Sequence, residues 1–568
     1  MINKLPPLFA LLTLLLVPTS GLSQVSNFGK SKLNMVASVH PLATKAGIKA
    51  FEKGGNAIDA AIATAVTLGV VDGYNSGLGG GCFVLIRRAD GSIVAIDGRE
   101  MAPAASHRDM FVEQGRADTD ASQIGPLAIG IPGALKAYDQ AIREHGRLEL
   151  RDVMLPAAEI ADNGFAISKL YSDKINHVAR HLKKFPAAAK ILLNPDQTIR
   201  QPGDILKQKD LANTYRQIAN HGIEWFYEGK FAIEINDWMR KNDGIITRQD
   251  FQNYTTKIRE PIISDYRGYK IVGFPPPSSG GVHVAQILNI LEWFDLKQLH
   301  REDPIRMNHL VVEAMKLAFA DRAYWLGDSD YVNVPKQLVS KEYAKSLASK
   351  IDLTKAVEVR THGTPPRADS EFFEKHTTHL TAADKEGNWV AITTTNNTWF
   401  GSKVIVPGLG VFMNNQMDDF SIKPGVPNAY GLIGSEQNAI APGKRPLSSM
   451  SPTIVFKDDQ PILTVGAAGG PKIITQVVWA IINHLDLKMS VQDAISQARI
   501  HHQWSPDLLY VEESIHANMR EQLEKYGHQL RENSRDKSGV SQAIGFDPAT
   551  GEFVGAHDPR VPGLAAGQ

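Results

Sequence analysis

The chain changes character at residue 377, and this change constrains its fold more than any other feature. Residues 353–376 contain one glycine, two consecutive prolines and many charges, which is typical of an exposed, flexible linker. Residues 377–383 and 388–395 are rich in threonine, alanine and other strand-compatible side chains, and the sequence Asp-Lys-Glu-Gly at 384–387 separates them. Two such runs around a polar turn predict a β-hairpin that begins where the linker ends.

The turn of this hairpin also sets which residues face each other. Counting outward from the turn places Thr377 opposite Thr394 or Thr395, and a β-bulge would shift the pairing by one residue. A threonine on a strand is ordinarily no more than a good strand former. Here the neighbouring strand brings a second hydroxyl to Thr377, so this end of the hairpin is a candidate reactive site.

A second candidate feature is a glycine-rich loop late in the chain. Residues 463–465 form a strand-like run, residues 466–470 form a loop that ends in Gly469 and Gly470, and Pro471 opens an apolar helical segment. Proline suits the first turn of a helix, where its missing N–H is not needed. Two glycines ahead of a helix leave backbone N–H groups exposed, and such groups stabilise an oxyanion. The loop therefore predicts an oxyanion hole.

The earlier part of the chain alternates between helical and strand-like patterns up to about residue 350. Residues 35–71 start with a short strand pattern and continue into alanine-rich helical sequence, and further helices are predicted at 284–294 and 307–324. No repeat of the length that marks a solenoid is found. A chain of 568 residues can bury a large core in several packed layers.

Composition and motifs exclude several kinds of partner and site. Lys+Arg and Asp+Glu are balanced at 61 each, so no charge excess favours nucleic acid or an anionic membrane surface. The sequence has no G-x-S-x-G, H-E-x-x-H or Walker A motif. The glycine run at 77–81 leads into a strand-like segment and not into a helix, which excludes a dinucleotide-binding loop.

Cysteine and histidine give no sign of a metal or redox site. Cys82 is the only cysteine, it precedes an apolar run, and it is expected to be a buried structural thiol. The pairs His376/His379 and His501/His502 have no third ligand motif near them, so ordinary structural histidines are expected rather than metal ligands. No metal or organic cofactor is predicted.

The N-terminus has the pattern of an export signal. Lys4 precedes an apolar run at residues 8–17, and Pro18 and several small residues follow. This pattern predicts a signal peptide over residues 1–23 that is cleaved near Gln24, because the apolar run is short for a membrane span. The alternative is an uncleaved membrane anchor. We therefore expect an exported protein, and the scarcity of cysteine suits a bacterial periplasm.

Several motifs together resemble the γ-glutamyltranspeptidase (glutathione hydrolase) family. From residue 377 onward they are TTHLTAADKEGNWVAITTTNNTWFGSKV, NNQMDDF, KRPLSSMSPTIV, GAAGGPKIIT, ARIHHQWSPD and a late HDPR. Before that point they are NSGLGGG at 75–81, DGREMAP at 97–103 and PPPSSGG at 275–281. The resemblance covers essentially the whole chain after the signal, and the motifs are specific in combination.

This resemblance implies a four-layer αββα sandwich of the N-terminal-nucleophile hydrolase type, an α+β fold with two central antiparallel sheets. It also implies that the chain cuts itself between His376 and Thr377. The large subunit would then span 24–376, with the linker at its end, and the small catalytic subunit would span 377–568. The two subunits are expected to remain together as a heterodimer, because the sandwich is built from both.

After cleavage, Thr377 would supply both the nucleophile and the base. Its free α-amine, with an unperturbed pKa of about 7.7–8.0, is partly neutral near pH 7 and lies within reach of its own hydroxyl. The resemblance assigns Thr395 the role of orienting the nucleophile, which agrees with the pairing expected from the turn. It assigns Gly469 and Gly470 to the oxyanion hole.

The resemblance also assigns residues to a γ-glutamyl group, whose far end carries an α-carboxylate and an α-ammonium. Arg99 would bind the carboxylate through two N–H groups. Ser448 and Ser449 would be further donors to the same carboxylate.

The ammonium would have Asp419 as its counter-ion, assisted by Asn397 and Gln416. The segment 421–432, rich in proline and glycine, resembles the lid loop of the family, with Tyr430 over the γ-glutamyl pocket. A lid of this kind favours small γ-glutamyl amides such as glutathione over long polymers.

The resulting prediction is a ping-pong γ-glutamyltransferase and glutathione hydrolase. Thr377 would expel cysteinylglycine or another amine, and water or an amino acid or dipeptide acceptor would take the γ-glutamyl group from the ester. Two alternatives stay open. An acylase of the same family would remove glutaryl groups from β-lactam precursors and would have no use for Asp419, because a glutaryl group lacks the ammonium. An exported γ-glutamyl-binding protein that never matures would need no nucleophile.

Overall fold

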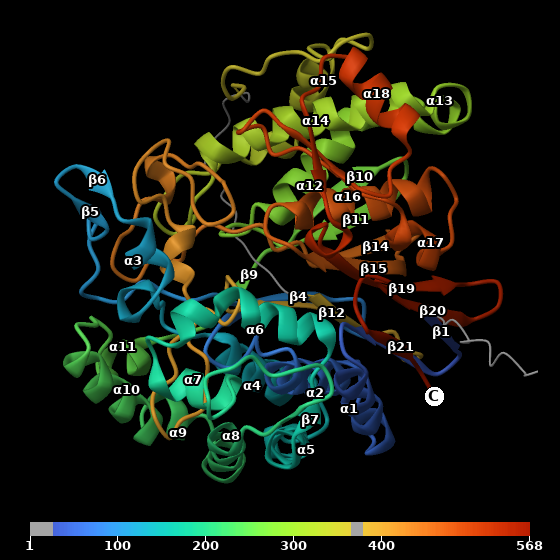
Figure 1. Cartoon of the computed structure of the whole chain (residues 1–568). Helices are drawn as coiled ribbons and strands as arrows, with labels where there is room; N and C mark the ends of the chain where they lie inside the picture. The colour runs from blue at the N-terminus through green and yellow to red at the C-terminus, as the bar shows by residue number, and fades with distance from the viewer. Residues whose placement is uncertain (1–26, 365–378) are drawn as a thin grey trace, which may run out of the picture.

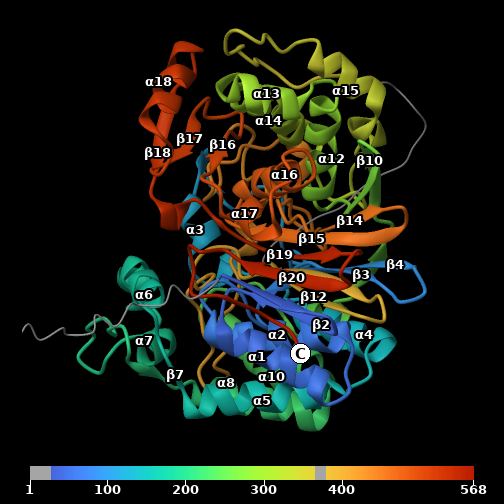
Figure 2. The ribbon, with the colours of Figure 1, turned by 90° about the vertical axis from the view of Figure 1, so that its right-hand side faces the viewer.

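Two seven-stranded antiparallel sheets, stacked face to face, form the centre of the molecule, and helices cover both outer faces (Figures 1 and 2). The computed structural model describes residues 27–364 and 379–568. The first sheet has the order β1 (Phe28–Ser31), β20 (Glu552–His557), β19 (Val540–Asp547), β15 (Gln460–Ala468), β14 (Thr453–Lys457), β11 (Tyr269–Gly273) and β10 (Ile262–Tyr266). The second has the order β21 (Leu564–Ala566), β2 (Asn34–Ser38), β12 (His379–Asp384), β13 (Trp389–Thr395), β3 (Gly81–Arg87), β4 (Ile93–Gly98) and β9 (Lys257–Arg259).

Successive side chains along each strand point to opposite faces, so each sheet has an apolar layer on both of its faces. On β3, Phe83 and Leu85 lie in the layer between the sheets, whereas Cys82, Val84 and Ile86 lie in the layer against the helices. This period of two is the geometry of a strand that is buried on both faces. The prediction that Cys82 is a buried structural thiol is confirmed.

The outer layers differ in which part of the chain supplies them. One consists of helices α1 (Pro41–Glu52), α2 (Ala57–Val71), α4 (Ala134–His145), α5 (Leu150–Asn163) and α8 (Lys209–His221), and the other of α12 (Gly280–Leu291), α14 (Pro304–Trp325), α16 (Lys472–Leu485) and α17 (Val491–Ser496). All residues of α2 are buried, because this helix packs on the second sheet and is covered by α1 and α5. Its N-terminus is closed by a capping box between Asn56 and Asp59. The αββα sandwich that the resemblance implied is confirmed.

The predicted hairpin is confirmed over the residues that the structure describes. Strands β12 and β13 pair antiparallel, with His379 opposite Thr393 and Ala383 opposite Trp389. The helices predicted from the sequence near residues 290 and 315 are present as α12 and α14. Residues 353–364, the described part of the predicted linker, contain neither helix nor strand.

Two predictions fall outside the described residues. The cleavage site between His376 and Thr377 is one, and the signal peptide at 1–23 is the other. Within residues 27–364 and 379–568, no helix is both long enough and apolar enough to cross a membrane.

Strand β15 is longer than the sequence indicates. The prediction ended this strand at residue 465, but the ladder with β19 continues through Ala468. Gly466 is required within it, because a Cβ there would lie 2.3 Å from the imidazole of His379 on the other sheet. The predicted glycine-rich loop is therefore shortened to Gly469 and Gly470.

Strands from the two described stretches are interleaved in both sheets. In the first sheet, β20, β19, β15 and β14 lie between β1 on one side and β11 and β10 on the other. In the second sheet, β12 and β13 lie between β2 and β3. Neither stretch of the chain completes a sheet by itself.

Candidate active site

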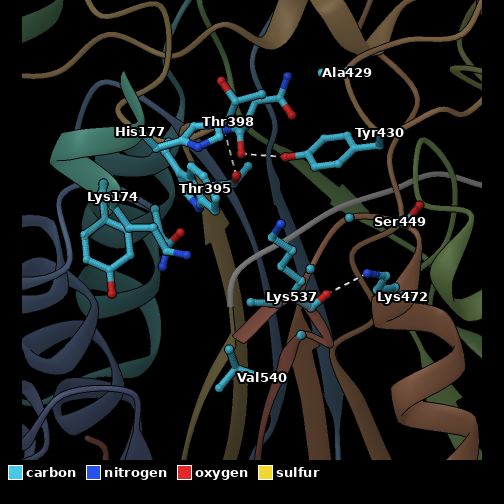
Figure 3. Close-up of a pocket in the computed structure, with 18 of the residues that line it drawn as sticks. Lys174, His177, Thr395, Thr398, Ala429, Tyr430, Ser449, Lys472, Lys537 and Val540 are labelled. Carbon is cyan, nitrogen blue, oxygen red and sulfur yellow. Dashed lines mark hydrogen bonds between the residues drawn. The ribbon is translucent and has the colours of Figure 1, made fainter. Parts of the chain in front are cut away.

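A cavity of about 520 Å³ opens where the end of β13, the two glycines after β15 and several loops converge. Figure 3 shows Thr395, Thr398, Tyr430 and Ser449 arranged around it. Nine residues assigned from the sequence line this cavity, and they are Thr395, Asn397, Gln416, Asp419, Tyr430, Ser448, Ser449, Gly469 and Gly470. Arg99 is not among the lining residues, and Thr377 lies outside the described part of the chain.

Thr395 is the last residue of β13, and its hydroxyl is oriented by the backbone that follows. The N–H of Asn397 donates to the Thr395 Oγ1 at 2.7 Å. Asn397 itself has the left-handed backbone conformation, with φ 76°. The Thr395 hydroxyl donates to no acceptor among the described residues, so its proton is available for an acceptor in the cavity.

The two glycines ahead of α16 have backbone conformations that other residues adopt only under strain. Gly469 has φ 131° and Gly470 has φ 61°. Among the described residues, neither N–H has a hydrogen-bond acceptor. Unpaired N–H groups beside a cavity are the donors that an oxyanion needs.

Asp419 is surrounded by donors that fix its carboxylate. Arg99 Nη2 donates to its Oδ2 at 2.8 Å and Gln416 Nε2 donates to the same atom at 3.1 Å. Asn428 Nδ2 donates to Oδ1 at 3.3 Å. The carboxylate is thus held in one orientation at the wall of the cavity.

Arg99 is fully buried and already bound to two carboxylates. Besides Asp419, its Nη1 donates to Glu100 Oε2 at 3.1 Å. Burial raises the pKa of Glu100 to about 7, although the adjacent arginine lowers it. In this structure Arg99 therefore lies behind Asp419 as its counter-ion, and its direct contact with a substrate carboxylate stays a prediction.

Gln416 supplies an acceptor without a partner. Its side chain is almost completely buried and lines the cavity, yet the Oε1 atom has no hydrogen-bond donor in the described part of the chain. A buried acceptor left unpaired is costly. Together with the Asp419 carboxylate, it makes this end of the cavity suitable for a group that carries several N–H donors.

The segment 421–432 closes over this end of the cavity. The Tyr430 hydroxyl donates to the carbonyl of Asn397 at 2.6 Å, and Figure 3 shows its ring pointing to the centre of the site. The ring covers Gly470 so closely that a Cβ on this glycine would lie 2.6 Å from it. The N–H of Ala429 donates to Asp418 Oδ2 at 2.9 Å, which ties the segment to the residue beside Asp419. Burial raises the pKa of Asp418 to about 6.

Several lining residues were not found from the sequence. Arg322 comes from α14, and Lys174 and His177 come from α6 (Lys169–Leu182). The Lys174 ammonium lies 3.9 Å from the centre of the Trp399 ring, a cation–π contact. A charged residue on a helix is ordinarily a solvent-exposed one, so no local pattern marks these residues.

The histidines have structural contacts. His501 is hydrogen-bonded to Thr475 and Gln503, and His502 to Asp507. One cluster of possible metal ligands exists among the described residues, with ligand atoms of His309, Glu313 and His528 within 4.8 Å of one another. Its carboxylate is already paired, because the Lys316 ammonium donates to it at 3.0 Å.

The same architecture occurs in solved structures. The crystal structure of cephalosporin acylase from Bacillus halodurans superimposes with a TM-score of 0.85 at 28% identity, covering 98% of this chain and 99% of that chain. The crystal structure of Helicobacter pylori gamma-glutamyltranspeptidase covers 56% of this chain and 90% of that chain, with a TM-score of 0.54 at 40% identity. The four layers and the site at the sheet ends define an N-terminal-nucleophile hydrolase.

The particular family follows from the sequence relatives. The family model for gamma-glutamyltranspeptidase matches residues 43–568. The glutathione hydrolase proenzyme of Escherichia coli (strain K12) is 42% identical over 95% of this chain and 92% of its own length. The chain belongs to the γ-glutamyltranspeptidase family.

Proposed function

We propose that this chain is the precursor of an exported γ-glutamyltranspeptidase that hydrolyses glutathione and transfers γ-glutamyl groups. The observation that carries the proposal is the pairing, in one cavity, of an ammonium-type subsite at Asp419 and Gln416 with unpaired N–H groups at Gly469 and Gly470. The first fits the free end of a γ-glutamyl group, and the second fits the oxyanion formed at its γ-carbonyl.

Thr377 is the proposed nucleophile. In the described hairpin His379 pairs with Thr393, and two residues further along the same register lead to Thr377 and Thr395. The Thr395 hydroxyl, which accepts from Asn397, has its proton left to donate to the nucleophile. The α-amine of Thr377, free after cleavage, takes the hydroxyl proton as general base.

The reaction then proceeds in two balanced steps. The Thr377 hydroxyl oxygen bonds to the γ-carbonyl carbon, the C–N bond breaks, and the amine leaves with the proton that the α-amine had accepted. Water, or the amine of an amino acid or dipeptide, then bonds to the carbonyl carbon of the γ-glutamyl ester and gives up a proton to the α-amine. The C–O bond to Thr377 breaks, the Thr377 oxygen takes that proton back as its hydroxyl, and the product is glutamate or a new γ-glutamyl amide. The residues proposed to hold the γ-glutamyl group are those of the cavity together with Arg99.

Maturation would divide the chain into residues 24–376 and 377–568. The proenzyme name of the Escherichia coli relative supports a precursor that is processed into subunits. The interleaved strands support continued association of the two pieces, because their separation would break hydrogen-bond ladders inside both sheets. Export rests on the signal pattern at residues 1–23.

An acylase that removes glutaryl groups is the second candidate, favoured by the similarity to the Bacillus halodurans structure. A glutaryl group carries no ammonium and would leave Gln416 Oε1 without a donor. The ammonium of a γ-glutamyl group would supply that donor, so the transpeptidase is the better fit.

The test is a denaturing gel with intact-mass analysis of wild type, Thr377→Ala and the matched control Thr378→Ala. We expect two wild-type fragments, the smaller beginning at Thr377, and one uncut Thr377→Ala chain. Thr378→Ala should still be cut. A wild type that stays in one piece and binds glutathione without turnover would instead support the binding-protein alternative.

A further inference from the structure

Arg322 has an unusual position for an arginine on a helix. It lies near the end of α14, its side chain is almost fully buried, and it lines the cavity next to Ser449. Long charged side chains on helices normally extend into solvent. A buried one at the wall of a substrate cavity therefore needs an explanation.

The guanidinium of Arg322 holds both serines of the LSSM motif. Its Nη2 donates to Ser449 Oγ at 3.2 Å. Its Nε donates to Ser279 Oγ at 3.0 Å, and the Ser279 hydroxyl donates in turn to the carbonyl of Ser448 at 2.6 Å. Ser279 belongs to the PPPSSGG motif, so this motif connects Arg322 to the backbone of the LSSM serines.

The bond to Ser449 decides where the hydroxyl proton of that serine points. A hydroxyl has one proton and two lone pairs. Because Arg322 donates to the oxygen, the proton is directed away from the arginine, and Ser449 lines the cavity. Ser449 can thus donate its hydroxyl proton to a ligand in the cavity.

The charge of Arg322 has no direct counter-ion within the part of the chain that the structure describes. Among the residues described, no carboxylate forms an ion pair with it, in contrast to Arg99, which is bound to Asp419 and Glu100. Burial lowers the pKa of Arg322 to about 10, and only the more distant Asp419 opposes this effect. A buried charge without a partner is strongly destabilising, and a ligand carboxylate would remove that cost.

We infer that Arg322 is a specificity-determining positioning residue for the α-carboxylate of the γ-glutamyl group. It donates to the Ser449 hydroxyl and places behind it a positive charge that forms no ion pair with a carboxylate of residues 27–364 or 379–568. This role rests on the proposed function, and it is separate from the predicted role of Arg99, whose charge is already compensated by two carboxylates.

The experiment compares three p-nitroanilides that differ only at the far end of the acyl group. The γ-glutamyl compound has both the carboxylate and the ammonium, the glutaryl compound has only the carboxylate, and the 4-aminobutyryl compound has only the ammonium. The variants are Arg322→Gln and Arg322→Lys. The matched control is Arg306→Gln, on the same helix but with a partly exposed side chain that is not in the cavity.

For Arg322→Gln we expect kcat/KM to fall by about 10- to 100-fold with the two carboxylate-bearing substrates, mainly through KM, the range expected for a charge-assisted contact. The 4-aminobutyryl substrate should change less than about twofold, because it makes no contact that depends on the charge. Arg322→Lys should recover part of the loss, since it keeps the charge but not the two-pronged donor. Arg306→Gln should match wild type.

Equal losses with all three substrates would assign Arg322 a structural role only and overturn the inference, as would no loss at all. If Arg322→Gln does not fold or mature, Arg322→Lys answers the same question, because a loss confined to the carboxylate-bearing substrates supports the inference and a uniform loss overturns it. A wild type inactive on the γ-glutamyl compound would overturn the proposed function as well, whereas an active wild type with a uniform variant loss overturns this inference alone.

Discussion

The hydrogen bond between the Tyr430 hydroxyl and the Asn397 carbonyl allows a direct test of the proposal that residues 421–432 form a lid. Tyr430→Phe removes this hydrogen bond of 2.6 Å and leaves the ring over Gly470 in place. A net contribution of about 1 kcal/mol is typical of such a bond, because water replaces part of it when the lid opens. One kcal/mol corresponds to roughly a fivefold change in an equilibrium constant. The closed lid should therefore be about fivefold less favoured in the variant.

The assay measures kcat/KM for γ-glutamyl-p-nitroanilide and for poly-γ-glutamate. A small donor depends on the closed lid, so its kcat/KM should fall about fivefold, mostly through KM. A long polymer is accepted only with the lid open, so its kcat/KM should hold or rise. The ratio of the two values should thus change about fivefold in favour of the polymer.

The control is Tyr331→Phe. This tyrosine also donates to a backbone carbonyl, that of Pro442 at 2.8 Å, but it does not line the cavity. An unchanged ratio in Tyr430→Phe, or an equal change in Tyr331→Phe, would refute the assignment of this segment as a lid.

Three further predictions address the reacting centre and a buried acid. Thr395→Val keeps shape but loses the hydroxyl, so we expect both self-cleavage on a gel time course and kcat to slow by about 100-fold or more, with little change in melting temperature. Gly470→Ala places a Cβ 2.6 Å from the Tyr430 ring at φ 61°, so steady-state kinetics should show at least about a tenfold loss in kcat/KM. Burial raises the pKa of Asp72, a cavity residue, to about 7. The protonated carboxyl therefore stabilises the folded state, and this contribution is complete below the unfolded pKa near 4 and is lost as pH rises through 7. Denaturant unfolding from pH 4 to 8 should show this loss in wild type, and in Asp72→Asn the free energy of unfolding should fall less steeply with pH. The same dependence on pH in both proteins would contradict the assignment.

The parts of the fold that could be predicted are those governed by local patterns. The polar turn at 384–387 allowed the hairpin and its pairing to be predicted, and apolar helical patterns allowed α12 and α14 to be predicted. The end of β15 was missed, because Gly466 resembles a loop residue in sequence. Its place in a strand depends on packing against His379, which comes from a distant segment.

The candidate site likewise contains residues that motifs predict and residues whose place depends on distant contacts. The residues assigned through the family motifs meet in one cavity, apart from Arg99, which lies behind Asp419, and Thr377, which is outside the described residues. Arg322 was missed because its neighbours on α14 carry no motif, and its inferred role depends on contacts with Ser279 and Ser449 far away in the sequence. Long-range contacts of this kind leave no periodic signal.

The interleaving of the strands has a consequence for the timing of folding. Strands β12 to β15, β19 and β20, which occupy the middle of the sheets, are synthesised after all the strands that flank them except β21. The earlier strands cannot pair across the centre until the last third of the chain has been made, and such non-local pairing is slow. Until then their open edges need protection from aggregation. For the export proposed above, the consequence is that both central sheets are still incomplete while the first two thirds of the chain are being made.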